Sequence, residues 1–162
     1  MLKVIKYPNT ILRKTAKPIV DFNDTLAKIA TDMAEVMFAD KGVGLAGPQV
    51  GIQQKIILAG NRKNHDYQAY INPKITFSSK STEIGEEGCL SLPKIFGLVT
   101  RAKKIRVKYQ DLTGKVHKEK FKGFPAIILQ HEIDHLNGVL FIDRATEITQ
   151  GQDILDQLKE KK

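Results

Sequence analysis

The clearest periodic pattern of apolar and polar positions lies in residues 24–39. Apolar side chains recur there at the spacing of one helix face, namely Leu26, Ile29, Ala30, Met33, Val36 and Met37. Asn23 is a residue type that caps helix N-termini, and Gly42 is a typical stop signal. We therefore predict an amphipathic helix over residues 24–39, with its methionines packed in the core.

Four later segments have the composition of β-strands. Residues 55–58, 67–77, 105–110 and 115–121 are enriched in isoleucine, valine and aromatic side chains and alternate in part between apolar and polar. Asp111-Leu112-Thr113-Gly114 separates the last two and has turn composition. These two strands are predicted to form a hairpin.

A second helix is predicted to start near Pro125, because proline suits the first turn of a helix. The apolar run of residues 126–129 indicates that this helix is buried and central, and Gly138 is its expected terminator. Near the C-terminus, Ile154, Leu155 and Leu158 lie on one face of a short amphipathic helix. We expect this last helix to pack on the body of the protein.

The length and composition favour a compact domain. A chain of 162 residues with 41% hydrophobic residues suits a single domain over residues 1–162. One cysteine excludes an internal disulfide and makes a reducing compartment the simpler assumption. The sequence shows no charged-then-apolar leader and no apolar run of the roughly 18 residues that cross a bilayer. We expect a cytoplasmic protein without membrane contact.

The formal net charge of +8 raises the question of nucleic-acid binding. Basic residues are concentrated at residues 101–104, 115–120 and 159–162, without interleaved aromatic residues, and the chain has no tryptophan. A base-stacking surface would require such aromatic residues. The sequence therefore predicts a solvated basic surface and no sequence-specific nucleic-acid recognition.

The strongest chemical signal is the pair His131 and His135, which lie four residues apart in the second helix. Residues at this spacing share a helix face, so both rings can bind one metal ion. Glu132 flanks the ion as a candidate general base, which is the arrangement of zinc hydrolases. Such a site usually takes a third protein ligand and leaves the fourth position to water.

Spacing alone leaves the third ligand open. One relative of the motif places a third histidine at position 141, but this chain has Phe141 there. Glu147 is available twelve residues beyond His135, although it lies past the expected helix end. The upstream candidate is Cys89, in the glycine-flanked segment of residues 85–93. A lone cysteine without context is more often a small buried apolar residue than a ligand.

The chain resembles the peptide deformylases in three separated motifs, in order and spacing. The motifs are Gly42-Val43-Gly44-Leu45-Ala46-Gly47-Pro48-Gln49, Glu87-Gly88-Cys89-Leu90-Ser91 and His131-Glu132-Ile133-Asp134-His135. The N-terminal Tyr7-Pro8 and Arg101 are also similar, so the likeness spans almost the whole chain. Gly47 departs from the alanine that is more common in the family.

The resemblance implies one divalent metal ion bound by Cys89, His131 and His135. These donor types suit zinc, iron, nickel or cobalt. The family likeness favours Fe(II) as the physiological ion. A metal-activated hydroxide would attack the formyl carbon of an N-formylmethionyl nascent peptide, with Glu132 first accepting the proton and then passing it to the departing amine.

The resemblance also implies how the substrate is held. The Gln49 side chain and the Leu90 amide would stabilise the developing oxyanion. The substrate-binding residues would be Val43, Gly44, Gly88, Phe124, Ile127 and Ile128. The peptide would pair with backbone as a short added strand. Weak electrostatic contact with the ribosome is a further expectation.

The predicted architecture is α+β, with small mixed or antiparallel sheets wrapped around a central helix that carries the HExxH motif. An N-terminal helix and a short C-terminal helix complete it. Asp134 is expected to be structural, bonded either to Arg101 or to a nearby amide, and His65 and His117 are expected at the surface. Two other classes remain as alternatives: a general zinc peptidase, and a noncatalytic module that binds ribosomal RNA and holds a structural metal.

Overall fold

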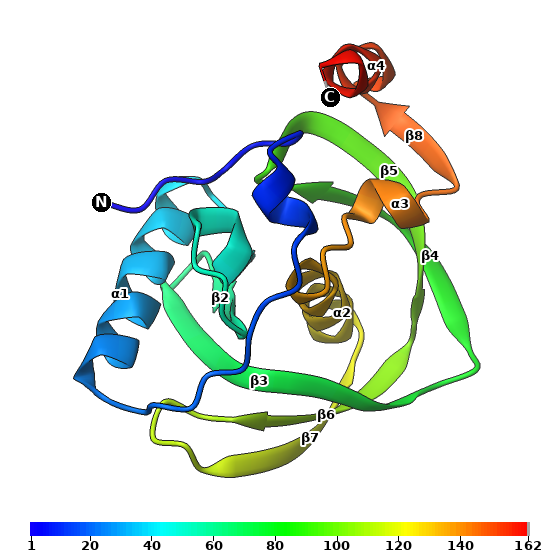
Figure 1. Cartoon of the computed structure of the whole chain (residues 1–162). Helices are drawn as coiled ribbons and strands as arrows, with labels where there is room; N and C mark the ends of the chain where they lie inside the picture. The colour runs from blue at the N-terminus through cyan, green and yellow to red at the C-terminus, as the bar shows by residue number, and fades with distance from the viewer. Residues whose placement is uncertain (162) are drawn as a thin grey trace.

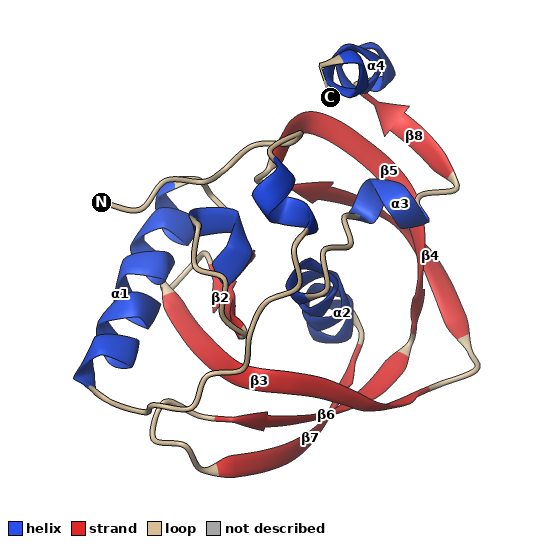
Figure 2. Cartoon of the chain, in the orientation of Figure 1, coloured by secondary structure: helices blue, strands red, loops and turns tan. Residues whose placement is uncertain are grey.

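The computed structural model describes residues 1–161, in which two antiparallel sheets surround a buried helix (Figures 1 and 2). The larger sheet has the strand order β1-β2-β3-β6-β7 and the smaller one the order β4-β5-β8. The elements are η1 (Thr10–Arg13), α1 (Asp24–Ala39), β1 (Gly44–Ala46), η2 (Gly47–Val50), β2 (Ile56–Asn61), β3 (Asp66–Ser78), β4 (Thr82–Cys89), β5 (Leu92–Ala102), β6 (Lys104–Gln110), β7 (Val116–Lys122), α2 (Phe124–Leu136), α3 (Phe141–Arg144), β8 (Glu147–Gln150) and α4 (Gln152–Glu160), where η denotes a 3-10 helix. No helix within residues 1–161 has both the length and the apolar content to span a bilayer.

Helix α1 has the predicted bounds. The Asn23 side chain accepts a hydrogen bond of 3.1 Å from the Leu26 backbone N–H, which satisfies one of the free donors at the helix start. Met33 and Met37 are fully buried against β1 and β2. The apolar face read from the sequence is therefore the core face.

Strands β2, β3, β6 and β7 match the four predicted strands within three residues at each end. Asp111 closes the β6–β7 hairpin, because its side chain accepts hydrogen bonds from the Thr113 and Lys115 backbone N–H groups. Ile105 and Val107 of β6 point inward to α2.

Strands β4 and β5 form a long hairpin that the hydrophobic pattern did not predict. The segment contains Gly85, Gly88, Pro93 and Gly97, which interrupt alternation. Packing requires glycine at position 88, because a Cβ atom there would lie 2.6 Å from Cε1 of Phe96 on the neighbouring strand. The pairing of β4 with β5 therefore depends on contacts across strands, which a linear pattern does not show.

Helix α2 occupies the centre, as predicted (Figure 1). Pro125 lies in its first turn, and Gly138 follows its end with φ 73°. The Val139 backbone N–H donates to the Asp134 carbonyl at 3.0 Å, which satisfies a carbonyl of the last turn. The helix contacts both sheets, through β1, β2, β5 and β7. In the C-terminal helix α4, Leu155 is buried and packs against the body, as expected.

Candidate metal centre

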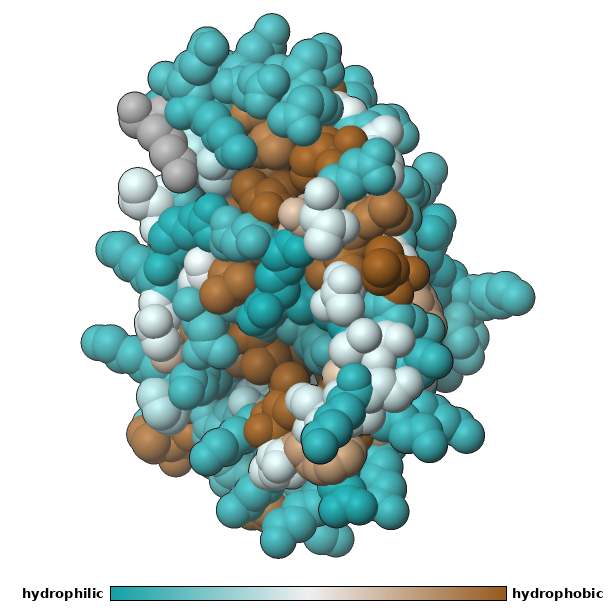
Figure 3. All heavy atoms as spheres, turned by 90° about the vertical axis from the view of Figure 1, so that its right-hand side faces the viewer, coloured by the Kyte–Doolittle hydropathy of each residue, from teal (hydrophilic) through white to brown (hydrophobic). Residues whose placement is uncertain are grey.

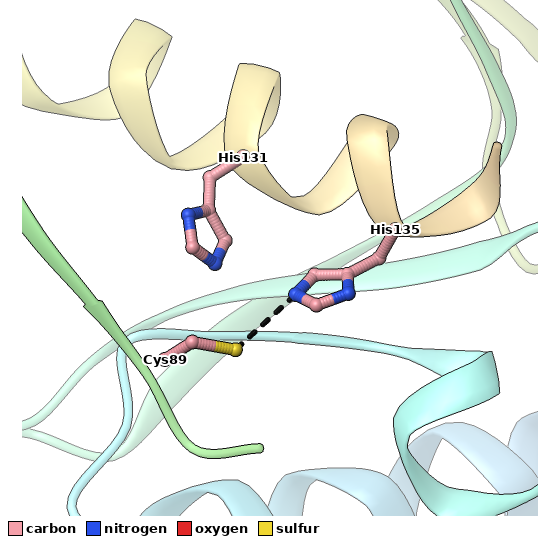
Figure 4. Close-up of side chains that lie close together, drawn as sticks. All are labelled: Cys89, His131 and His135. Carbon is pink, nitrogen blue, oxygen red and sulfur yellow. Dashed lines mark hydrogen bonds between the residues drawn. The ribbon is translucent and has the colours of Figure 1, made fainter. Parts of the chain in front are cut away.

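The fold brings together one sulfur and two imidazoles from distant parts of the chain (Figure 4). Cys89 ends β4, and His131 and His135 project from α2. The three ligand atoms lie within 4.8 Å of one another, and Cys89 Sγ is 3.3 Å from Nε2 of His135. Both histidines are buried and Cys89 is half-buried. Three converging donors on a strand end and one helix face form a preorganised site.

A buried ion-pair network fixes the ring of His131. Its Nδ1 lies 2.9 Å from Oε1 of Glu87, and Arg101 donates to both oxygens of Glu87 at 2.8 and 2.9 Å. Arg101 also donates to Asp134 at 2.7 Å and is thus the observed one of the two predicted partners, and Arg144 donates to both oxygens of Asp134 at 2.7 and 2.9 Å. Because Nδ1 of His131 is engaged, Nε2 is the atom left for a metal.

The pKa values of the two histidines are shifted in opposite directions. Burial lowers the pKa of His131, but Glu132, Cys89 and Glu87 together raise it well above the usual value. Burial and the neighbouring charge of His131 lower the pKa of His135 well below the usual value, which favours its neutral form. A neutral imidazole is the form that binds metal.

Glu132 is buried beside the two histidines, and its carboxylate atom Oε1 has no hydrogen-bond partner within the described part of the chain. Burial raises the pKa of Glu132 to about 7, against the opposing charge of His131. An orphaned buried carboxylate is costly unless a bound group satisfies it. A pKa near neutrality suits a group that takes and returns a proton.

The donor set fits a divalent metal ion. A thiolate and two imidazoles are ligands that zinc and ferrous iron accept, and the buried Glu132 oxygen without a partner is an acceptor that a bound water can satisfy. Glu147, the other candidate third ligand, is exposed on β8 and is not part of the donor group. His65 stacks on Phe38 and His117 pairs with Asp111, both away from the centre.

Gln49 lies against the centre from η2 and is buried. Its Oε1 accepts from the Ala46 backbone N–H at 2.9 Å, which orients the amide. Its Nε2 donates to Cys89 Sγ at 3.3 Å and to Ser91 Oγ at 3.1 Å. The carbonyl of Leu90, in the turn after Cys89, accepts from Lys6 Nζ at 2.8 Å.

A cavity of about 770 Å³ opens beside the three donors. Its lining includes all the residues that the resemblance assigned to the substrate, which are Val43, Gly44, Gly88, Phe124, Ile127 and Ile128. Gln49, Cys89, Leu90, His131 and Glu132 also line it. Figure 3 shows the molecule from the β4–β5 side, where hydrophobic side chains gather between hydrophilic ones. This volume is in the range of small-molecule and peptide side-chain sites.

Some residues of the cavity lining have no recognisable signal in the sequence. Phe96 and Val99 of β5 belong to the strand that the pattern missed. Lys41 and Arg62, which follow the ends of α1 and β2, also line the cavity. Once β5 is recognised as the partner of β4, Phe96 is expected next to Gly88, because the two are register partners.

The chain matches known proteins over most of its length. The family profile of polypeptide deformylases matches residues 1–151. A peptide deformylase of Thermotoga neapolitana is 46% identical over 146 residues, which cover 89% of this chain and 87% of that protein. One from Desulfotalea psychrophila is 40% identical over 152 residues, or 91% of this chain and 89% of that protein.

Solved structures agree with these matches. The crystal structure of peptide deformylase from Thermotoga maritima has a TM-score of 0.86 at 44% identity and covers 90% of this chain and 98% of its own. The enzyme from Plasmodium falciparum has a TM-score of 0.89 at 37% identity, with coverage of 97% and 93%. The predicted α+β class is therefore confirmed, and the chain belongs to the polypeptide deformylase family.

Proposed function

We propose that this deformylase removes the formyl group from the N-formylmethionyl end of newly made peptides, with Fe(II) bound by Cys89, His131 and His135. Family membership supports the deformylase activity. The observation that carries the proposal is a buried carboxylate, Glu132, beside three converging metal donors at the wall of an open cavity. A divalent ion in this site would supply Lewis acidity and lower the pKa of water toward neutrality.

The remaining chemistry belongs to residues of the chain. Glu132 accepts a proton from the attacking water and returns it to the amine that leaves. Water adds to the formyl carbon, the carbon–nitrogen bond breaks, and formate and a free amino terminus result. A pKa of about 7 for the buried Glu132 supports both halves of this transfer.

Gln49 and the backbone N–H of Leu90 are the proposed donors to the formyl oxygen as negative charge develops there. The Gln49 amide is held beside Cys89 by its bond to Ala46, so little reorganisation is needed. Removing a donor of this kind typically costs about 2.7–4 kcal/mol of barrier.

The peptide is proposed to bind between two strand edges. β1 and β4 are edge strands of their sheets, and both contribute to the cavity lining. An extended peptide can hydrogen-bond to such edges. The methionine side chain would enter the apolar part of the cavity, against Val43, Phe124, Ile127 and Ile128.

Several finer points belong to the same proposal. The protein is cytoplasmic and contacts the ribosome weakly through its positive charge. It forms one catalytic domain over residues 1–162, of which the structure describes residues 1–161. Zinc, nickel or cobalt can take the place of iron, since the same donors bind them.

The test is an anaerobic formate-release assay with formyl-Met-Ala-Ser on preparations of defined metal content. Glu132→Gln should keep its metal and lose activity, whereas Cys89→Ala should lose both. Activity that is indifferent to Cys89→Ala contradicts the ligand set. Cleavage of internal peptide bonds in an unformylated peptide would favour a general peptidase instead.

A further inference from the structure

Seven basic side chains gather on the outward face of β3, β6 and β7. They are Lys74 on β3, Lys104, Arg106 and Lys108 on β6, and Lys118, Lys120 and Lys122 on β7, all of them exposed. We call this set the basic sheet face. The opposite face of β6 packs on α2 through Ile105 and Val107, so the basic sheet face points away from the core. In Figure 1 these strands lie below α2.

The strand register places like charges directly opposite one another. Lys104 is paired with Lys122, Arg106 with Lys120, and Lys108 with both Lys118 and Lys74. Like charges at opposite positions destabilise a sheet. None of the seven takes part in an ion pair among residues 1–161. Fold stability does not explain this arrangement, whereas a polyanionic partner does.

We propose that the basic sheet face binds the phosphate backbone of RNA without reading its sequence. Cations on alternate residues of a strand repeat at about 6.6–6.8 Å, and neighbouring strands lie about 4.8 Å apart, which gives a closely spaced array of positive charge. Such an array binds phosphates by releasing counterions.

The exposed aromatic residue on this face is Phe77, and the Arg106 guanidinium lies 5.3 Å from its ring centroid. The fold thus supplies the aromatic neighbour that the linear sequence lacks. A ring covered by arginine is a poor membrane anchor, because interfacial binding needs an apolar face that enters the lipid. The same stacked pair suits an unpaired base.

The basic sheet face is continuous with the rim of the cavity. β7 ends at Lys122, and Phe124, two residues later, lines the cavity. An RNA surface bound to β6 and β7 would therefore hold the cavity mouth close to it. The choice of RNA over DNA rests on the proposed function, because newly made peptides leave a particle whose surface is largely RNA.

The experiment measures binding of a fluorescent RNA hairpin to the metal-loaded enzyme by anisotropy, across a salt series. The face variant carries Lys104→Glu, Lys108→Glu and Lys120→Glu, which places glutamate opposite a cation in each pair. The control variant carries Lys3→Glu, Lys14→Glu and Lys159→Glu, exposed positions elsewhere with the same change in net charge.

Wild-type affinity should fall about 10³-fold or more between 50 and 200 mM salt if six or more phosphates are neutralised. The face variant should bind at least about tenfold more weakly, with a salt slope smaller by about 2–3 units, since each phosphate contact contributes about 0.7–0.9. The control variant should keep the wild-type slope. Melting temperature should be equal or higher in the face variant, because attraction replaces repulsion across the strands.

Three results overturn the proposal: equal weakening in both variants, no RNA binding by the wild type at 50 mM salt, or binding to phosphatidylserine vesicles in place of RNA. Formate release is measured in parallel on the same preparations and should be unchanged in the face variant. A failure of the deformylase function therefore shows as lost formate release in the wild type, independently of the RNA result.

Discussion

The carboxylate of Glu132 occupies the space that a side chain at Gly44 would need. A Cβ atom built on Gly44 would lie only 3.0 Å from Cδ and from Cγ of Glu132. Gly42 has a similar relation to Leu90, whose Cδ1 would lie 2.8 Å from such an atom. The glycines of the first motif therefore make room for side chains of the protein itself, in addition to any backbone approach by a substrate.

Gly44→Ala should displace the Glu132 carboxylate while leaving the three metal donors in place. A shift of about 1 Å in a reacting group can cost about 10²-fold in rate, so kcat should fall by roughly that factor. The matched control is Gly85→Ala on β4, where an added Cβ meets nothing within 4 Å. Steady-state formate release together with metal content distinguishes the two. Wild-type kcat in Gly44→Ala would show that the contact has no catalytic consequence.

The parts of the fold that were predicted correctly depend on local signals. Helix α1 has a capping asparagine and a clear 3.6-residue period, and α2 has a proline at its start and a glycine after its end. β4 and β5 were missed because their glycines and Pro93 hide the alternation. β1 and β8, with three and four residues, are too short to show a pattern.

The residues of the metal centre also divide into those that a local signal predicts and those that it does not. His131 and His135 were found from helix spacing alone, but spacing left Glu147 and Cys89 as rival third ligands. The choice of Cys89 came from the family likeness, and the fold brings its sulfur to the histidines. The hydrogen bond from Nδ1 of His131 to the Glu87 carboxylate joins residues 44 positions apart, so neither period nor composition could have predicted it.

Glu87→Gln should weaken metal binding without removing a ligand. The substitution removes the charged acceptor that orients His131. It also removes one of the negative charges that neutralise the buried Arg101 guanidinium. Loss of such a partner typically lowers metal affinity about 10–100-fold. Competition with a chromogenic chelator measures the affinity directly. Glu86→Gln is the control, because the Glu86 side chain is exposed and accepts a hydrogen bond from the Thr149 hydroxyl. An equal effect of both substitutions would refute the role of Glu87 in orienting His131.

The same carboxylate should contribute to acid stability. Burial raises the pKa of Glu87, but hydrogen bonds from Arg101 and His131 outweigh it and lower the pKa to about 2. The contribution is therefore complete above the usual pKa of 4.5 and is lost as pH falls from 4.5 to 2, with a magnitude of about 3 kcal/mol. Urea unfolding of metal-free protein should show this loss in the wild type and its absence in Glu87→Gln. Parallel curves for the two proteins over that window would contradict it.

Phe124→Ala should reduce substrate binding with little effect on stability. The ring is 61% exposed at the cavity rim, so the folded protein gains little from it. Covering it with a methionine side chain is worth about 1–2 kcal/mol, which predicts a loss of roughly five- to thirty-fold in kcat/KM for a formyl-Met peptide. Phe77→Ala, on the basic sheet face, is the control with similar exposure. An unchanged kcat/KM in Phe124→Ala would place the methionine pocket elsewhere.

Metal removal should lower stability by an amount that depends on free metal. A ligand that binds the folded state alone stabilises it by about 2.7 kcal/mol at a concentration 100 times Kd. Cys89 is remote in the sequence from His131 and His135, so the unfolded chain offers no comparable site with three donors.

Chemical denaturation of the metal-free protein with and without Zn²⁺ measures this gain. The metal-dependent increase should disappear in Cys89→Ala and persist in Glu132→Gln, because Glu132 is not one of the three donors. A full increase in Cys89→Ala would mean that the ion is held by other residues. Loss of the increase in Glu132→Gln would make that carboxylate a metal ligand and contradict its proposed role in proton transfer.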